Sequence, residues 1–389
     1  ANREQVASIG YETSQKAHNA LRWLLARQGK YIDGEMTVVW KLPQNLKEKD
    51  SNLALDVVDL FGDTQETFLA DFDWAAECRD EDDIELDRKF AEKLNQAMAG
   101  YRAKLQPDDE VIILSVDAAT TGRLAVTYYQ EVPGNEFIDR VLHWHQNCTW
   151  PRWIKLHETK KWVFINNTAP SPNEIALAAY GTEQEKGYLA CSDKLKKTTI
   201  RRILPCIIGL SPKIPADIVK AAVNRASNPQ AYSSFVWQNC VAPVACAMIK
   251  YNEFDGKVNS MELEKDRSYL FGQLLAILEK VEERALYLQE SKTDDRLTNA
   301  KKMWNVYTRR PAITYERLYS HIVRAYLKRL NPGARAKIEN EIMQIINVLR
   351  ETDGFNNNPL NERYLLGYYE EREKLMKSKG EKSNEGGEE

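Results

Sequence analysis

Residues 296–337 hold the densest set of side chains in this chain that could bind a ligand. The run carries eleven Lys or Arg residues and one acid, Glu316, a net charge of +10 within a chain whose formal charge is −3. Exposed charges more than a Debye length apart are largely screened from each other, so such a local excess acts on a polyanion that approaches one face. The run therefore favours nucleic acid as the partner.

The spacing within this run predicts an amphipathic helix over residues 315–330, which contain no Gly or Pro. One face would carry apolar residues and tyrosines, namely Leu318, Ile322, Ala325, Tyr315, Tyr319 and Tyr326. The opposite face would carry a basic stripe of Arg317, His321, Arg324 and Lys328. Aromatic residues at helical spacing usually pack in a core, so we expect the stripe to contact phosphates and the tyrosines to be buried.

A second basic cluster lies on a predicted helix over residues 192–204, where Lys194, Lys197 and Arg201 share one face by i, i+3, i+7 spacing. This spacing suits a phosphate backbone and equally suits a solvated helix. A solvated face is also the alternative for the first run, whose charges could pair with Glu279, Glu282 and Glu283. The candidate DNA-binding residues are Lys301, Lys302, Arg309, Arg310, Arg317, Arg324, Lys328, Arg329, Lys194, Lys197 and Arg201.

The remaining polar residues form no catalytic or metal-binding pattern, so we predict no catalytic residue, no metal and no cofactor. On a helix over residues 136–146, His143 and His145 would point about 200° apart and could not share one metal with Cys148. Asp117, at the end of a hydrophobic strand, has two interpretations. It could be a catalytic carboxylate or, as we favour, a cap of the following hairpin turn. The nine acids of residues 71–87 are most simply a solvated loop or helix edge.

The composition, with 43% hydrophobic and 29% charged residues, is ordinary for a soluble globular protein of 389 residues. The apolar stretches are far shorter than the roughly 18 residues that span a bilayer, so no membrane association is expected. Six cysteines are scattered without a C-x-x-C pair, which favours reduced thiols and a cytoplasmic location.

The pattern predicts an α+β fold in which a mixed portion with a β-hairpin precedes a helical region and an antiparallel helical bundle. Residues 110–116 and 124–129 are the two strands of the hairpin, with Gly122 in the turn. Residues 37–40 are a further strand. The expected divisions are 1–165 for the α/β portion, 166–256 for the helical region, 261–379 for the bundle and 380–389 for a disordered tail.

Several separated tracts resemble the large subunit of the type I-C CRISPR surveillance complex. They are LSVDAATTGRLAVTYY at 114–129, WHQNC at 144–148, LPC at 204–206, AAVNRASNP at 221–229, RSYLFGQLLA at 267–276 and NERYLLGYYEER at 361–372. The resemblance extends from about residue 11 to 377. Members of that family are usually longer at the N-terminus, so this chain looks like one that lacks the leading domain.

The resemblance implies a subunit without enzymatic activity. Its partners would be target double-stranded DNA, the displaced non-target strand, crRNA-bound backbone subunits and a separate helicase-nuclease. The family's C-terminal module is also made separately as a small subunit, and Met261 is a possible internal start that would release 129 residues. The basic run then becomes a candidate groove for the non-target strand. A metal-dependent nucleic-acid enzyme and a purely scaffolding helical protein are the alternatives.

Overall fold

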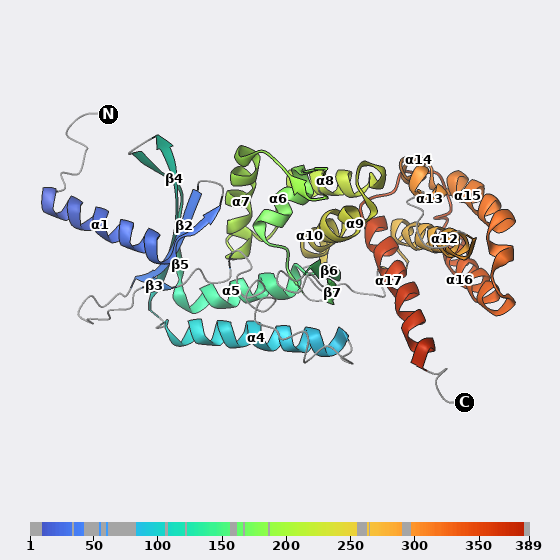
Figure 1. Ribbon diagram of the computed structural model, residues 1–389, viewed down its shortest axis with the longest axis horizontal. Helices are drawn as coiled ribbons and strands as arrows, with labels where there is room; N and C mark the ends of the chain where they lie inside the picture. Colours follow the sequence, from blue (N-terminus) through green and yellow to red (C-terminus); the bar gives the residue numbers. More distant parts are fainter. Residues whose placement is uncertain are drawn as a thin grey trace. The chain divides into compact units, whose positions relative to one another are not determined.

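A computed structural model describes residues 10–32, 35–42, 54–55, 60, 83–105, 108–120, 123–155, 162–165, 168–185, 187–254, 263, 265–289 and 297–384 (Figure 1). The chain divides into two compact units whose segments alternate along the sequence. Unit 1 comprises residues 1–146, 153–173 and 192–213. Unit 2 comprises residues 147–152, 174–191 and 214–389. Each unit is described by itself.

Unit 1 is built on an antiparallel sheet in the order β1-β2-β4-β5, with β3 paired to β2. Its strands are β1 (Lys30–Ile32), β2 (Glu35–Leu42), β3 (Ala54–Leu55), β4 (Glu110–Thr120) and β5 (Arg123–Pro133). The runs of Val, Ile, Thr and Tyr in β4 and β5 favour extended backbone, and the pairing of Glu110 with Pro133 confirms the predicted hairpin. Gly122, expected in its turn, lies outside the described residues.

One helix of unit 1 packs on the sheet through apolar side chains. Leu21 and Leu25 of α1 (Tyr11–Gln28) pack on an apolar cluster of Val38, Leu114 and Val116. The other long helices are α4 (Asp83–Ala103), α5 (Gly134–Asn147) and α7 (Asp193–Ile207). A small separate sheet pairs β6 (Arg152–Lys155) with β7 (Trp162–Ile165).

Unit 2 is almost entirely helical. Its first part holds α6 (Pro172–Tyr180), the β8 (Thr182–Glu183) and β9 (Leu189–Ala190) pair, α8 (Ala216–Ala226), η2 (Pro229–Ala231), α9 (Ser234–Val236), η3 (Trp237–Val241) and α10 (Ala242–Phe254). Its second part holds α12 (Arg267–Gln289), α13 (Asn299–Lys302), α14 (Trp304–Arg309), α15 (Pro311–Ala325), η4 (Leu327–Arg329), α16 (Pro332–Glu351) and α17 (Arg363–Asn384). The buried helix α12 contacts α13, α15, α16 and α17 (Figure 1).

This arrangement confirms the predicted α+β class with a helical C-terminal region. Helix α7 groups with the sheet of unit 1. The expected division at residues 165 and 256 stays a prediction. An independently folding bundle over residues 261–379 stays a prediction. Helix α17 continues to Asn384, so the first half of the predicted tail is helical, and residues 385–389 lie outside the described part of the chain.

Three predicted helices have different ends or interiors. Helix α7 continues through Pro205 to Ile207. The proline removes the one backbone hydrogen bond that residue 205 would donate to the carbonyl of Arg201. The helix expected over 234–250 contains a π-turn, η3, just before Pro243, where a wider turn accommodates a residue without an N–H. The helix expected over 315–330 ends at Ala325, and the tighter turn η4 places Leu327 and Leu330 in the core.

Among the described residues, no helix combines the length and the apolar character that crossing a membrane requires.

Candidate nucleic-acid interface

Within the basic run, three consecutive helices and a turn, α13, α14, α15 and η4, together present exposed cations, and the run ends on α16 with Arg335 and Lys337. The core takes up Trp304, Tyr307, Leu318 and Leu327 of these elements, whereas many of their charged residues are exposed. Within the described part of the chain, no carboxylate lies within ion-pairing distance of these side chains, and Arg329 lies over the ring of Tyr326. We call them the basic surface: Lys302, Arg309, Arg310, Arg317, Lys328 and Arg329.

Lys301 is placed differently from its neighbour Lys302. Its side chain is only 6% exposed, its Nζ lies 3.3 Å from Glu279 Oε1, and it donates to Ser234 Oγ at 3.1 Å. Thr298 caps α13 by accepting from the Lys301 backbone N–H, which fixes the direction of this short helix. Lys301 is therefore too buried to contact a phosphate at the surface.

Arg324 belongs to α15, but its side chain lies outside what the structure describes. Lys328 is not on the same helix as Arg317, because α15 ends at Ala325 and the chain turns through η4. The predicted continuous stripe over residues 317–328 is therefore wrong in its geometry. The side chains of Arg317 and Lys328 are nevertheless exposed.

The aromatic residues of the run are mainly structural. Trp304 and Tyr307 are buried, with Trp304 Nε1 donating to Tyr364 OH at 3.0 Å and Tyr307 OH donating to Phe271 O at 2.7 Å. Tyr315 is also buried, which confirms its predicted core position, and its ring stacks on half-buried Tyr319. Burial raises the pKa of Tyr307 and Tyr315, so both phenols stay protonated at neutral pH.

The acids of α12 have partners other than the basic surface. Glu279 lies between Lys301 and Arg372, at 3.3 Å from each. Glu283 pairs with Arg372 at 3.0 Å, and the charges of Arg372 and Lys280 lower its pKa to about 2 against the effect of burial. Glu282 accepts from the N–H and side-chain amide of Asn299, both at 2.8 Å. One of these acids, Glu279, therefore pairs with Lys301, as the alternative interpretation supposed. Among the described residues, these acids form no ion pair with a cation of the basic surface.

The second predicted cluster, on α7, is largely engaged with the sheet of unit 1. Arg201 donates through Nε to both carboxylate oxygens of Glu35 at 3.0 Å, and its NH2 also lies 3.0 Å from Oε2. The Glu35 side chain is 7% exposed and also accepts from Thr127 Oγ1 at 2.5 Å. Lys197 Nζ donates to Asp117 Oδ2 at 3.0 Å. Of the three candidates, Lys194 alone is fully exposed.

Asp117 does not have the capping role that we favoured. It lies within β4, directly opposite Glu35 on β2, so both carboxylates face α7. Their repulsion is offset by Lys197 and Arg201, whose NH2 lies 3.7 Å from Asp117 Oδ2. Sequence reasoning missed this ion-paired cluster because its members are 80 and 166 positions apart. The alternation of Glu35 and Thr37, opposite Asp117 and Ser115, is a period-two pattern that signals a polar sheet face.

The histidines considered as metal ligands do not converge. His143 is exposed and His145 is buried on α5. Among the described residues, no group of three or more His, Cys, Asp or Glu side chains is placed to hold a metal ion.

Comparison with protein families places the chain in one of them. The model of a family described as CRISPR-associated protein (Cas_Csd1) matches residues 1–376. A search of curated proteins found no match.

Proposed function

The chain belongs to this family of CRISPR-associated proteins, and we propose that it is a non-catalytic, DNA-binding subunit of an RNA-guided interference complex. In such a complex, base pairing with the guide reads the sequence, while protein charge holds the strands. The proposed contribution of this chain is to hold the displaced non-target strand along the basic surface of unit 2.

The observation that carries the proposal is the contrast between exposed and buried charge in residues 301–329. The buried Lys301 is paired with Glu279, whereas the six cations of the basic surface face solvent without a carboxylate partner among the described residues. A cation that neutralises a phosphate releases counterions, which supplies most of the affinity of sequence-independent binding. Trp304 and Tyr307 are buried in the core and cannot stack on a base. We therefore expect DNA to be bound through its phosphates.

The resemblance to the type I-C large subunit supports a place for the chain beside crRNA-bound backbone subunits, where it would help to present the R-loop to a helicase-nuclease. Both the tract at 267–276 and the tract at 361–372 belong to unit 2, within α12 and at the start of α17. Their pairing builds the scaffold that carries the basic surface.

A separate small subunit starting at Met261 would keep α12 to α17 but would lose Trp237. The indole of Trp237 is fully buried, and its ring centroid lies 5.2 Å from that of Trp304 and 5.8 Å from that of Tyr368. A fragment of residues 261–389 would expose this aromatic face, so the proposal requires that another apolar surface cover it.

The test is binding of a labelled single-stranded oligonucleotide, followed by fluorescence anisotropy between about 50 and 200 mM salt. The variant Arg310→Glu/Arg317→Glu/Lys328→Glu should weaken binding and reduce the salt slope by about 0.7 for each phosphate that the chain no longer neutralises. The control is Lys16→Glu/Lys213→Glu/Lys265→Glu, which changes the net charge equally at exposed residues outside the basic surface. Equally weakened binding in both variants would reject a localised site and leave the scaffolding alternative.

A second assay addresses the enzyme alternative. We expect the purified chain to leave DNA intact with Mg²⁺, because the carboxylate of Asp117 is held by Lys197 and Arg201. Cleavage that depends on the metal and disappears in Asp117→Asn would replace the proposal with a nuclease.

A further inference from the structure

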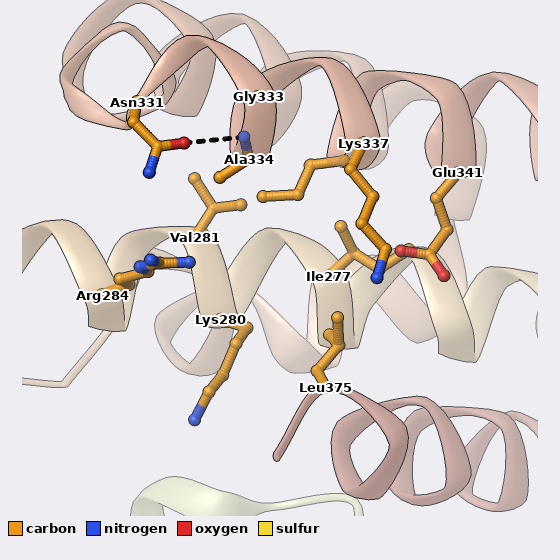
Figure 2. A pocket seen from close by; sticks show the side chains of 11 residues that line it. Ile277, Lys280, Val281, Arg284, Asn331, Gly333, Ala334, Lys337, Glu341 and Leu375 are labelled. Atoms are coloured by element: carbon orange, nitrogen blue, oxygen red, sulfur yellow. Dashed lines mark hydrogen bonds between the residues drawn. The ribbon is translucent and has the colours of Figure 1, made fainter. Parts of the chain in front are cut away.

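An open groove of about 460 Å³ lies between α12 and α16, with α17 at one side. In Figure 2, Ile277 and Val281 of α12 face α16, and Leu375 of α17 lies below them. None of the residues that line the groove belongs to the basic surface. The groove is thus a separate feature of unit 2.

The floor of the groove is aliphatic. Ile277 and Val281 are 1% and 3% exposed, and Ile338 and Leu375 are half-buried beside them. Ala334, one turn before Ile338 on α16, leaves room above the floor. Aliphatic walls of this kind fit an apolar side chain of a partner and give no hydrogen bond to a base or a phosphate.

The rim of the groove is cationic. Arg284 and Lys337 are exposed, and neither forms an ion pair within the described part of the chain. Lys280 Nζ donates to Glu283 at 3.2 Å, and the single acid of the lining, Glu341, accepts from Lys374 Nζ at 2.5 Å. The N-terminus of α16, capped by Asn331 Oδ1 at 2.7 Å from Ala334 N, adds a positive dipole end.

The aliphatic floor and the cationic rim together favour one class of binding partner. A strand held by its phosphates needs only an exposed set of cations, as on the basic surface, whereas the aliphatic floor of this groove would contact no phosphate. Because none of the described lining residues is aromatic, the floor would not stack a base either. An amphipathic helix that places aliphatic side chains in a groove and acids at its rim matches both the floor and the charge. We propose that this groove docks an acidic amphipathic helix of a partner protein, with its aliphatic side chains on Val281 and Ile338 and its acids beside Arg284 and Lys337.

The probe is a displayed library of random peptides of about 16 residues, selected against the full chain. We expect the selected peptides to carry Leu, Ile or Met at i, i+4 or i, i+3 spacing, flanked by Asp or Glu. A synthesised peptide from the selection should bind about tenfold more weakly when Arg284→Glu/Lys337→Glu is introduced, and about as weakly with Ile338→Asp. Thermal melts of both variants verify that the chain remains folded.

Two matched variants serve as controls. Met343→Asp alters an exposed apolar residue on α16 outside the groove, and Lys213→Glu/Lys265→Glu makes the same charge change elsewhere. Both should bind the peptide like the unaltered chain. Selected peptides without acids, or affinity that Ile338→Asp leaves unchanged, would overturn the proposal. Loss of oligo-dT binding in Ile338→Asp would instead assign the groove to nucleic acid. Because peptide selection uses no nucleic acid, it is independent of the DNA-binding test.

Discussion

Gly272 of α12 and Gly367 of α17 allow the backbones of these two helices to touch. A Cβ at Gly272 would clash with the backbone of Tyr364 and Tyr368, and a Cβ at Gly367 would clash with the backbone of Tyr269. The contact is reciprocal, so each glycine lies where the other helix passes closest. Both belong to the tracts that resemble the type I-C large subunit. The close backbone contact shows that both glycines serve the packing of the two helices.

Gly367→Ala should destabilise the chain by about 1–3 kcal/mol or more, because the new methyl group meets backbone atoms that have no rotamer to change. The measurement is the free energy of unfolding in urea. Gly333→Ala on α16 is the control, since nothing lies within 4 Å of its Cβ position. It should stabilise the helix by about 0.5–1 kcal/mol. Similar changes for the two variants would contradict a close crossing at Gly367.

The sequence predicted the elements well because their signals are local. The hairpin of β4 and β5, the helix α12 and the overall basic run are all visible as periodicity or composition. Whether each charge is buried depends on tertiary neighbours. Lys301 and Lys302 are adjacent, yet they differ by about 100° around the helix, and only Lys301 meets Glu279. Likewise, Arg201 reaches Glu35 across 166 positions, a pairing that no local pattern encodes.

Substitution of Lys301 should affect stability, whereas substitution of Lys302 should affect DNA binding. Lys301→Met removes one of the two cations beside Glu279, whose side chain is fully buried, and should lower the free energy of unfolding by about 3 kcal/mol. Lys302→Met should leave stability nearly unchanged and reduce the salt slope of oligonucleotide binding. Anisotropy and urea unfolding of the two variants provide the comparison. If Lys301→Met folds stably and Lys302→Met binds DNA normally, the assignment of the two residues fails.

Glu371 should make stability depend on pH. Burial, followed by the nearby charge of Glu341, raises the pKa of Glu371 from its usual 4.5 to about 7. A raised pKa means that the folded chain holds a proton that the unfolded chain has released, so this contribution to stability declines as pH rises from about 4.5 to 7. Glu371→Gln should therefore raise the melting temperature at pH 8 more than at pH 5. Glu351→Gln, at an exposed residue, is the control, and equal effects at both pH values would argue against a protonated Glu371.

In the second basic cluster, substitution of Arg201 should lower stability, whereas substitution of Lys194 should not. Arg201→Met leaves the buried Glu35 carboxylate with only Thr127 as a hydrogen-bond donor among the described side chains, directly opposite Asp117. The free energy of unfolding of unit 1 should fall by about 3–5 kcal/mol, since a buried charge without its partner is strongly unfavourable.

The double variant Arg201→Met/Glu35→Gln should recover part of this stability, because it removes the charge that the single variant leaves unpaired. Lys194→Met should change stability little and reduce oligonucleotide affinity only if α7 contributes to the interface. A double-mutant cycle in urea measures the Arg201–Glu35 coupling. A coupling near zero would mean that the ion pair is fully screened, and α7 would then hold the sheet through apolar contacts such as those of Ile200 and Ile203, which are buried.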